Sequence, residues 1–283
     1  MQINAHEMET IIRRALDEDI GTGDLTTSLL LDGDEEGRAK IFAKNEPIVV
    51  AGLEVCKNTF MLLDPGISFV AMRDDGALLK KGDVAARVEG RLSSIITAER
   101  VALNFLQRLS GIATLTWKYN EEIKGTGAKL LDTRKTTPGL RVLEKYAVSV
   151  GGGVNHRFGL FDAVMIKDNH IHAAGGIRNA MKRLSTNKVA MTGRKVEIEV
   201  TSLQEIHEVL SSEGAVDVIM LDNMNLDVMR EAVRMINGKT AVEASGNVTL
   251  ANIRAIAETG VNFISVGALT HSAPAADLSL LIE

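Results

Sequence analysis

Cysteine is nearly absent from this sequence, with Cys56 the single one among 283 residues. One thiol cannot form an internal disulfide, and there is no CxxC pair or finger-like spacing for a structural metal. Cys56 lies in the apolar stretch 53–63, where we expect a small, buried hydrophobic side chain. The sequence therefore excludes a scaffold held by internal disulfides.

Long apolar runs and an excess of basic charge are absent as well. No run approaches the roughly 20 apolar residues of a membrane span, and the N-terminal segment has no apolar signal core. The formal net charge of -5 argues against nucleic acid as a partner, since that usually needs a broad basic face. We expect a cytoplasmic enzyme with no membrane or nucleic-acid partner, in which a cleft can still concentrate positive charge.

Common nucleotide and hydrolase motifs are also missing: there is no Walker loop, no GxGxxG after a strand and no GxSxG elbow. What the sequence does contain changes character near residue 112. Up to that point helices and strands mix without regular alternation, which predicts an α+β domain over residues 1–112. The expected helices are 6–19, 52–63 and 97–122, with a bend at Ser110–Gly111, and the expected strands are 38–44, 67–72 and 83–89.

Residues 113–283 repeat a different unit, a short apolar run followed by a helical segment. Such alternation implies parallel strands joined by helical crossovers. Six units are too few for a complete eight-stranded barrel of about 250 residues, which leaves a partial barrel or an open doubly wound sheet. The expected strands are 128–131, 163–166, 196–198, 216–221, 240–244 and 263–266, with helices at 140–148, 176–184, 202–210, 226–236 and 250–258.

Polar or charged residues follow every one of these six runs. Parallel α/β folds place their ligands at the carboxyl ends of the strands, so six such ends in succession predict one shared site. The residues are 132–139 after the first run, then Lys167 to His170, Glu199, Asp222 with Asn223, Ser245 to Asn247, and Gly267 with Ala268.

The cations of this predicted site call for an anion. Arg134, Lys135 and Lys167 follow strands, and His156 and Arg157 follow the glycine run 151–153. Arginine offers a planar fork to carboxylate or phosphate, and lysine offers a point charge. The alternative for each cation is an ion pair with a surface acid.

Two carboxylates, Glu199 and Asp222, form the acidic counterpart. In a phosphate site they would hold Mg²⁺, directly or through water, or accept hydrogen bonds from sugar hydroxyls. The alternative is that they neutralise the lysines. The last two strand ends, 244–248 and 265–271, are small and polar and suit a phosphate, because glycine lets the backbone approach an anion. His271 either contacts that phosphate or caps the chain locally.

The remaining histidines carry weaker signals. His170 and His172 form an HxH pair for which no third metal ligand is evident, so a structural role is favoured. His207 falls within an expected helix, and we expect it at the surface.

Several long motifs resemble those of the quinolinate phosphoribosyltransferases, in order over nearly the whole chain. The similarity lies in LDTRKTTPGLR at 131–141, GGGVNHR at 151–157 with LFD at 160–162, KDNH at 167–170, EIEV at 197–200, LDNM at 221–224 and EASG at 243–246. Earlier segments that also resemble the family are EDIG at 18–21, GDLT at 23–26, AER at 98–100 and LSGIAT at 109–114. With this resemblance the expected α/β fold is a six-stranded partial TIM-like barrel after an N-terminal α+β sandwich domain.

The resemblance implies a reaction of quinolinate with phosphoribosyl pyrophosphate that gives nicotinate mononucleotide, pyrophosphate and carbon dioxide, with Mg²⁺ required. It implies that Arg134, His156, Arg157 and Lys167 hold the quinolinate carboxylates, and that Arg100 reaches the site of a neighbouring subunit in a homodimer. The other implied site residues are Lys135, Glu199 and Asp222 for ribose, pyrophosphate and Mg²⁺, and Thr133, Ser245, Gly246, Asn247, Val266, Gly267, Ala268 and His271 for substrate.

Two other functions compete with this one. The first is a related phosphoribosyltransferase of the same fold that acts on a different base, such as those linked to molybdate transport operons. The joint presence of Arg134, His156, Arg157 and Lys167 argues instead for a dicarboxylate. The second is a non-catalytic sensor of a phosphorylated metabolite, for which Lys135 and the two acids would be superfluous.

Overall fold

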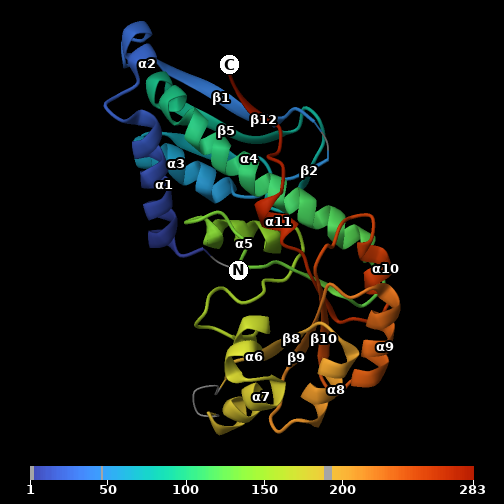
Figure 1. Cartoon of the computed structure of the whole chain (residues 1–283). Helices are drawn as coiled ribbons and strands as arrows, with labels where there is room; N and C mark the ends of the chain where they lie inside the picture. The colour runs from blue at the N-terminus through green and yellow to red at the C-terminus, as the bar shows by residue number, and fades with distance from the viewer. Residues whose placement is uncertain (1–2, 46, 188–192) are drawn as a thin grey trace. The chain divides into compact units, whose positions relative to one another are not determined.

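A computed structural model describes residues 3–45, 47–187 and 193–283 of the chain (Figure 1). Its residues group into two compact units, each described separately below. The first unit comprises residues 1–117, 136–152 and 268–283, and the barrel unit comprises 118–135 and 153–267. Among the described residues, no helix has the length and apolar character that crossing a membrane would require.

The first unit contains an antiparallel sheet in the order β12-β1-β5-β3. Alternate residues of β1, namely Ala39, Ile41 and Ala43, are buried, so one face of this strand lies against the core. That core also contains Phe60 of α3 and Leu103 of α4. The strands are β1 (Glu36–Ala43), β3 (Ser68–Ala71), β5 (Val84–Arg91) and β12 (Leu278–Ile282), and β2 (Ile48–Val49) pairs separately with β4 (Leu78–Leu79).

Two helices of the first unit begin at polar caps. Asn4 caps the first helix by accepting from the N–H groups of His6 and Glu7, and Asp24 caps the second by accepting from Thr27 N. The helices are α1 (Ala5–Ile20), α2 (Leu25–Leu30), α3 (Leu53–Leu63), α4 (Leu92–Glu122), α5 (Arg141–Val150) and α11 (Ala268–His271).

Helix α4 continues as one helix through Ser110–Gly111, where the sequence suggested a bend. The glycine has a packing role instead. A Cβ atom at Gly111 would lie 2.0 Å from the carbonyl oxygen of Pro274, so only glycine lets that backbone segment approach.

The barrel unit contains a parallel sheet in the order β6-β11-β10-β9-β8-β7. Each strand from β7 to β10 pairs with the next along the chain, and β6 pairs with β11. This is the cyclic order of a barrel rather than the reversed order of a doubly wound sheet. The strands are β6 (Lys129–Leu131), β7 (Val164–Ile166), β8 (Val196–Val200), β9 (Val218–Asp222), β10 (Ala241–Ser245) and β11 (Phe263–Ser265).

Helices follow these strands as the sequence predicted, and α7, α8 and α9 lie outside the strands in Figure 1. They are α6 (Asp168–Ala174), α7 (Ile177–Thr186), α8 (Leu203–Ser211), α9 (Leu226–Ile236) and α10 (Ile253–Ala257). The mixed α/β fold, with a six-stranded parallel sheet and a separate antiparallel sheet, is therefore confirmed. The sequence did not predict α2, α6, α11, β2, β4 or β12, which are short or lie in turn-rich segments.

Candidate active site

The chain after the glycine run enters the barrel unit alongside β6. Val154 forms a parallel bridge with Leu131, its N–H donates to Leu130 O at 2.8 Å, and its carbonyl accepts from Asp132 N at 3.2 Å. The next two residues then reach the buried Asp132 carboxylate, which accepts from Asn155 Nδ2 at 2.7 Å and from His156 N at 2.8 Å. This segment supplies His156 and Arg157 to the C-terminal end of the sheet.

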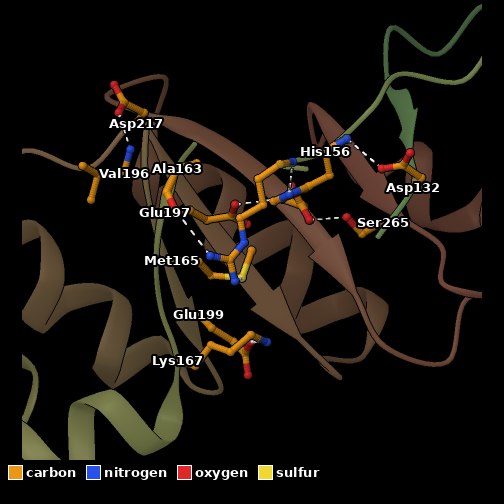
Figure 2. A network of polar contacts seen from close by, with 12 residues as sticks. Asp132, His156, Ala163, Met165, Lys167, Val196, Glu197, Glu199, Asp217 and Ser265 are labelled. Carbon is orange, nitrogen blue, oxygen red and sulfur yellow. Dashed lines mark hydrogen bonds and ion pairs between the residues drawn. The ribbon is translucent and has the colours of Figure 1, made fainter. Parts of the chain in front are cut away.

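The imidazole of His156 lies against two buried acids from other strands (Figure 2). Its Nε2 is 2.9 Å from Glu197 Oε2 on β8 and 3.6 Å from Glu243 Oε2 on β10. Glu197 is 6% exposed and Glu243 is 1% exposed, and Ser265 of β11 donates its hydroxyl to Glu243. Burial of two carboxylates is costly unless hydrogen bonds and charge compensate them.

The contacts of His156 with Glu197 and Glu243 determine the pKa of its imidazole. Burial lowers the pKa of His156, but hydrogen bonding to Glu197 and Glu243 and their negative charge outweigh burial and raise that pKa to about 9. For Glu197, burial has the opposite effect and raises the pKa, because it disfavours the charged carboxylate. Arg157 N donates to His156 Nδ1 at 2.7 Å, so Nδ1 carries a lone pair and the ring proton lies on Nε2.

His156, Glu197 and Glu243 also lie close enough to share a metal, with ligand atoms within 4.8 Å of one another. The hydrogen bonds argue against that use. A metal needs the lone pair of Nε2, whereas here Nδ1 holds the lone pair and Nε2 donates to Glu197. The trio fits a hydrogen-bonded network better than a metal site.

Arg157 and Arg134 bring two guanidinium groups together. Arg157 donates to Ala163 O and to Met165 Sδ, both at 3.4 Å. Burial and then the positive charge of Arg134 lower the pKa of Arg157. The negative charges of Glu197 and Asp162 act on Arg157 in the opposite direction. Neighbouring guanidinium groups suit a carboxylate or phosphate ligand, because each offers a planar fork of donors.

Lys167 follows β7 directly, and its Nζ lies 2.7 Å from Glu199 Oε2 on the neighbouring strand β8. His170 accepts from Lys167 N through Nδ1 at 3.0 Å and so fixes the start of α6. This is a structural role for His170, as the sequence indicated. Lys167 is 44% exposed in its side chain and remains accessible to a ligand.

The ends of β9 and β10 are joined through two asparagines. Asn223 and Asn247 both have positive φ, 53° and 51°, and Asn247 Nδ2 donates to Asn223 Oδ1 at 2.9 Å. Between them Gly246 has φ +94°, and a Cβ there would lie 2.2 Å from Asn223 Oδ1. Asp222 Oδ2 accepts from Asn223 Nδ2 at 2.8 Å, and Ser245 is partly exposed beside it.

Other predicted residues divide between the two units. In the barrel unit, Thr133 Oγ1 accepts from Lys135 N at 3.1 Å, and Lys135 is exposed. Val266 is buried and its N–H donates to Leu131 O at 3.0 Å, so its side chain and N–H are occupied within the fold. Gly267 follows it and is partly exposed. Arg100, Ala268 and His271 belong to the first unit; Arg100 on α4 and His271 on α11 are exposed.

Sequence reasoning gave no role to Asn155, Glu197 or Glu243, and it included Asp132 and Ser265 only as members of longer strand-end segments. A usable signal was present in the strand VEIEV, where Glu197 and Glu199 share one face of β8 while Val196, Ile198 and Val200 are buried on the other. A charged residue in the middle of a buried strand needs a partner inside the barrel.

Taken together, the fold and site define an α/β-barrel enzyme that acts on strongly anionic substrates at its strand ends. Comparison with known proteins makes this specific: the chain belongs to the quinolinate phosphoribosyl transferase family. The model of that family's C-terminal domain matches residues 112–281, and that of its N-terminal domain matches residues 24–110.

Relatives from bacteria and plants cover almost the whole chain. A probable carboxylating nicotinate-nucleotide pyrophosphorylase of Synechocystis is 47% identical over 96% of this chain and 91% of the relative. The chloroplastic carboxylating nicotinate-nucleotide pyrophosphorylase of Arabidopsis thaliana is 45% identical over 98% of this chain and 83% of its own length. The solved nicotinate-nucleotide pyrophosphorylase of Francisella tularensis superposes with a TM-score of 0.93 at 40% identity, covering 100% of this chain and 98% of that one.

Proposed function

We propose that this protein transfers the phosphoribosyl group of phosphoribosyl pyrophosphate to quinolinate and releases pyrophosphate and carbon dioxide. The product is nicotinate mononucleotide, which places the enzyme in de novo NAD biosynthesis. The observation that carries the proposal is that Arg134 and Lys167 follow the ends of β6 and β7 and that Arg157, held beside β6, reaches Ala163 O and Met165 Sδ next to β7. A pyridine dicarboxylate supplies the two negative charges that such a group of cations needs.

The quinolinate clamp orients the pyridine nitrogen toward the ribose. Arg134, Arg157 and Lys167 hold the two carboxylates, and His156 Nδ1 accepts a hydrogen bond from Arg157 N. As pyrophosphate leaves, positive charge develops on the ribose, and the ring nitrogen forms the new bond to its anomeric carbon. The bond to the adjacent carboxylate then breaks and carbon dioxide leaves; the electron pair stays on the ring carbon, where the neighbouring cationic nitrogen stabilises it, and a proton from solvent takes the place of the carboxylate. The chain's contribution is position and charge, without a covalent nucleophile.

Glu199 and Asp222 suit Mg²⁺ because they offer hard oxygen donors on the adjacent strands β8 and β9. When bound, Mg²⁺ would neutralise charge on the departing pyrophosphate. Lys135, exposed after β6, would stabilise the same anion. Because Mg²⁺ usually keeps several of its waters, Glu199 and Asp222 would hold it either directly or through one of those waters.

The 5′-phosphate of the ribose would bind at the last two strand ends. Gly246 and Gly267 permit close backbone approach, and Ser245 adds a hydroxyl. Thr133 and Asn247 would contact substrate through side chains, and Val266 through its main chain. Ala268 and His271 complete the set carried over from the family resemblance.

We also propose a homodimer in which Arg100 enters the partner's site, a cytoplasmic location, and a functional division of the chain at residue 112. Arg100 is 60% exposed in its side chain, and its contact with Glu99 is a long 3.8 Å. It is thus available for an anion outside its own helix. The division at residue 112 is supported by the adjoining matches 24–110 and 112–281.

One assay tests the activity. The protein is incubated with quinolinate, phosphoribosyl pyrophosphate and Mg²⁺, and nicotinate mononucleotide and carbon dioxide are measured, with nicotinate run in parallel. We expect turnover with quinolinate. Turnover with nicotinate alone would overturn the substrate assignment, and no turnover with any pyridine would favour a sensor.

A further inference from the structure

His156 has both ring nitrogens engaged within the protein. Nδ1 accepts from Arg157 N at 2.7 Å, and Nε2 donates to Glu197 Oε2 at 2.9 Å. Its side chain is 12% exposed. In this arrangement the imidazole has no donor left for a substrate carboxylate, so its influence on substrate passes through the residue that it holds, Arg157.

The two acids that hold the imidazole are themselves fixed. Glu243 accepts from the Ser265 hydroxyl and contacts His156 Nε2 at 3.6 Å, and both acids are more than nine-tenths buried. They come from β8 and β10, so the ring is braced by two strands of the sheet. Rigid elements of this kind hold a binding group more accurately than a loop can alone.

The main chain of the same segment is held from the opposite side. Asp132, directly after β6, accepts from His156 N at 2.8 Å (Figure 2). It also accepts from Asn155 Nδ2 at 2.7 Å. Residues 154–157 are thus fixed between β6 on one side and β8 and β10 on the other. Arg157 is the last residue of this fixed segment, and its guanidinium donates to Ala163 O and Met165 Sδ.

We propose that Glu197 and Glu243 are positioning residues that act through the His156 ring to set the guanidinium of Arg157 for one carboxylate of quinolinate. The inference rests on the proposed function and adds to it: His156 serves as a relay between the buried acids and Arg157. Quinolinate affinity therefore depends on two carboxylates that never touch the substrate, whereas binding of phosphoribosyl pyrophosphate does not depend on them.

The test uses Glu197→Gln and Glu243→Gln in the full-length protein, because glutamine keeps the size of glutamate and removes its charge. We expect the KM for quinolinate to rise roughly tenfold or more, since displaced positioning groups commonly have effects of this size. The KM for phosphoribosyl pyrophosphate should stay within about twofold of wild type, a pattern of lost binding confined to one substrate. The matched control is Glu258→Gln, an exposed acid paired with Arg254, which should leave both KM values unchanged.

A double-mutant cycle tests whether the effect of Glu197 on quinolinate binding passes through His156. His156→Asn preserves an acceptor near the Nδ1 position but is too short to reach the acids, so Glu197→Gln should cause no further loss in that background. Additive losses, an unchanged quinolinate KM, or equal increases in both KM values would overturn the inference, the last because it indicates general structural damage. Thermal unfolding of each variant separates misfolding from misplacement. A wild-type chain that neither binds nor turns over quinolinate would overturn the proposed function together with this inference.

Discussion

Arg108 and Glu144 join two helices of the first unit by a buried ion pair. Arg108 on α4 donates from Nη2 to Glu144 Oε1 at 2.7 Å and from Nε to the same oxygen at 3.1 Å. Glu144 on α5 is fully buried and also accepts from Thr137 N at 3.1 Å and Thr137 Oγ1 at 2.8 Å. Arg108 further donates to the carbonyls of Thr270 and Ala273. One ion pair thus holds the chain after Lys135 and the chain around His271 to the same helix.

Removal of one member of this pair should destabilise the protein strongly. Arg108→Ala leaves the Glu144 carboxylate buried without its cation, which we expect to lower the free energy of unfolding by about 3–5 kcal/mol. Urea denaturation measures the change. The control is Arg13→Ala, which removes an exposed pair with Glu9 on α1 and should cost about 0.5 kcal/mol or less. Equal losses for the two variants would contradict the difference in burial.

Stability should fall with acid partly through Asp64. A hydrogen bond from Arg91, followed by those from Gly66 N and Ser94, lowers the pKa of this buried carboxyl to about 2 from its ordinary value of 3.8. A lowered pKa means that the carboxylate stabilises the fold above about pH 4 and that this contribution is lost as pH falls toward 2.

Because Arg91 is 51% exposed, solvent screening reduces the contribution to about 1 kcal/mol. Asp64→Asn should abolish that part of the pH dependence between pH 4 and 2 in denaturant titrations and leave the remainder. A variant whose stability falls with acid as steeply as wild type would show that Asp64 is not responsible.

Gly246→Ala should affect both folding and the binding of phosphoribosyl pyrophosphate. The added Cβ meets Asn223 Oδ1 at 2.2 Å and the residue keeps φ +94°, so strain and overpacking should together cost roughly 2–4 kcal/mol. Gly238→Ala is the matched control, because that glycine has φ +71° but open space around it, and about 1 kcal/mol is expected. A KM for phosphoribosyl pyrophosphate that rises only with Gly246→Ala would support a phosphate role for this turn.

Mixing of two inactive variants should test the shared site. Arg100→Ala and Lys135→Ala each lose activity if Arg100 serves the partner's site and Lys135 serves its own. Random exchange of subunits makes half of the dimers mixed, and each mixed dimer has one intact site, so about one quarter of wild-type activity should return. Absence of recovery after subunit exchange has been verified by mass spectrometry would contradict the shared arrangement.

The sequence predicted the barrel unit well because its signal is local. Short apolar runs separated by helical segments became β6 to β11 in the expected order, and Lys167, Glu199, Asp222 and Ser245 lie at or near the strand ends. Strand β12 was not predicted, since the alternation of LSLLI is weak and its partner β1 lies far away in the chain.

The contacts of His156 with Glu197 and Glu243 could not be predicted from the sequence, because they depend on the pairing of strands that lie far apart in the chain. His156, Glu197 and Glu243 are separated by tens of residues, and they meet because β8, β9 and β10 pair in parallel and place alternate side chains inside the barrel. Charge alone suggested that His156 would face substrate. The register of neighbouring strands, which no local pattern encodes, instead puts two acids against its ring.

The pairing of β12 with β1, in which Ala39 lies opposite Ile282, has a consequence for synthesis on the ribosome. Strand β1 leaves the exit tunnel early, whereas its outer neighbour emerges only after the whole barrel unit has been translated. For most of translation, therefore, the nascent chain displays one unpaired strand edge with open N–H and C=O groups. We expect early truncated chains to associate through the open edge of β1 or to require a chaperone until β12 arrives and covers that edge.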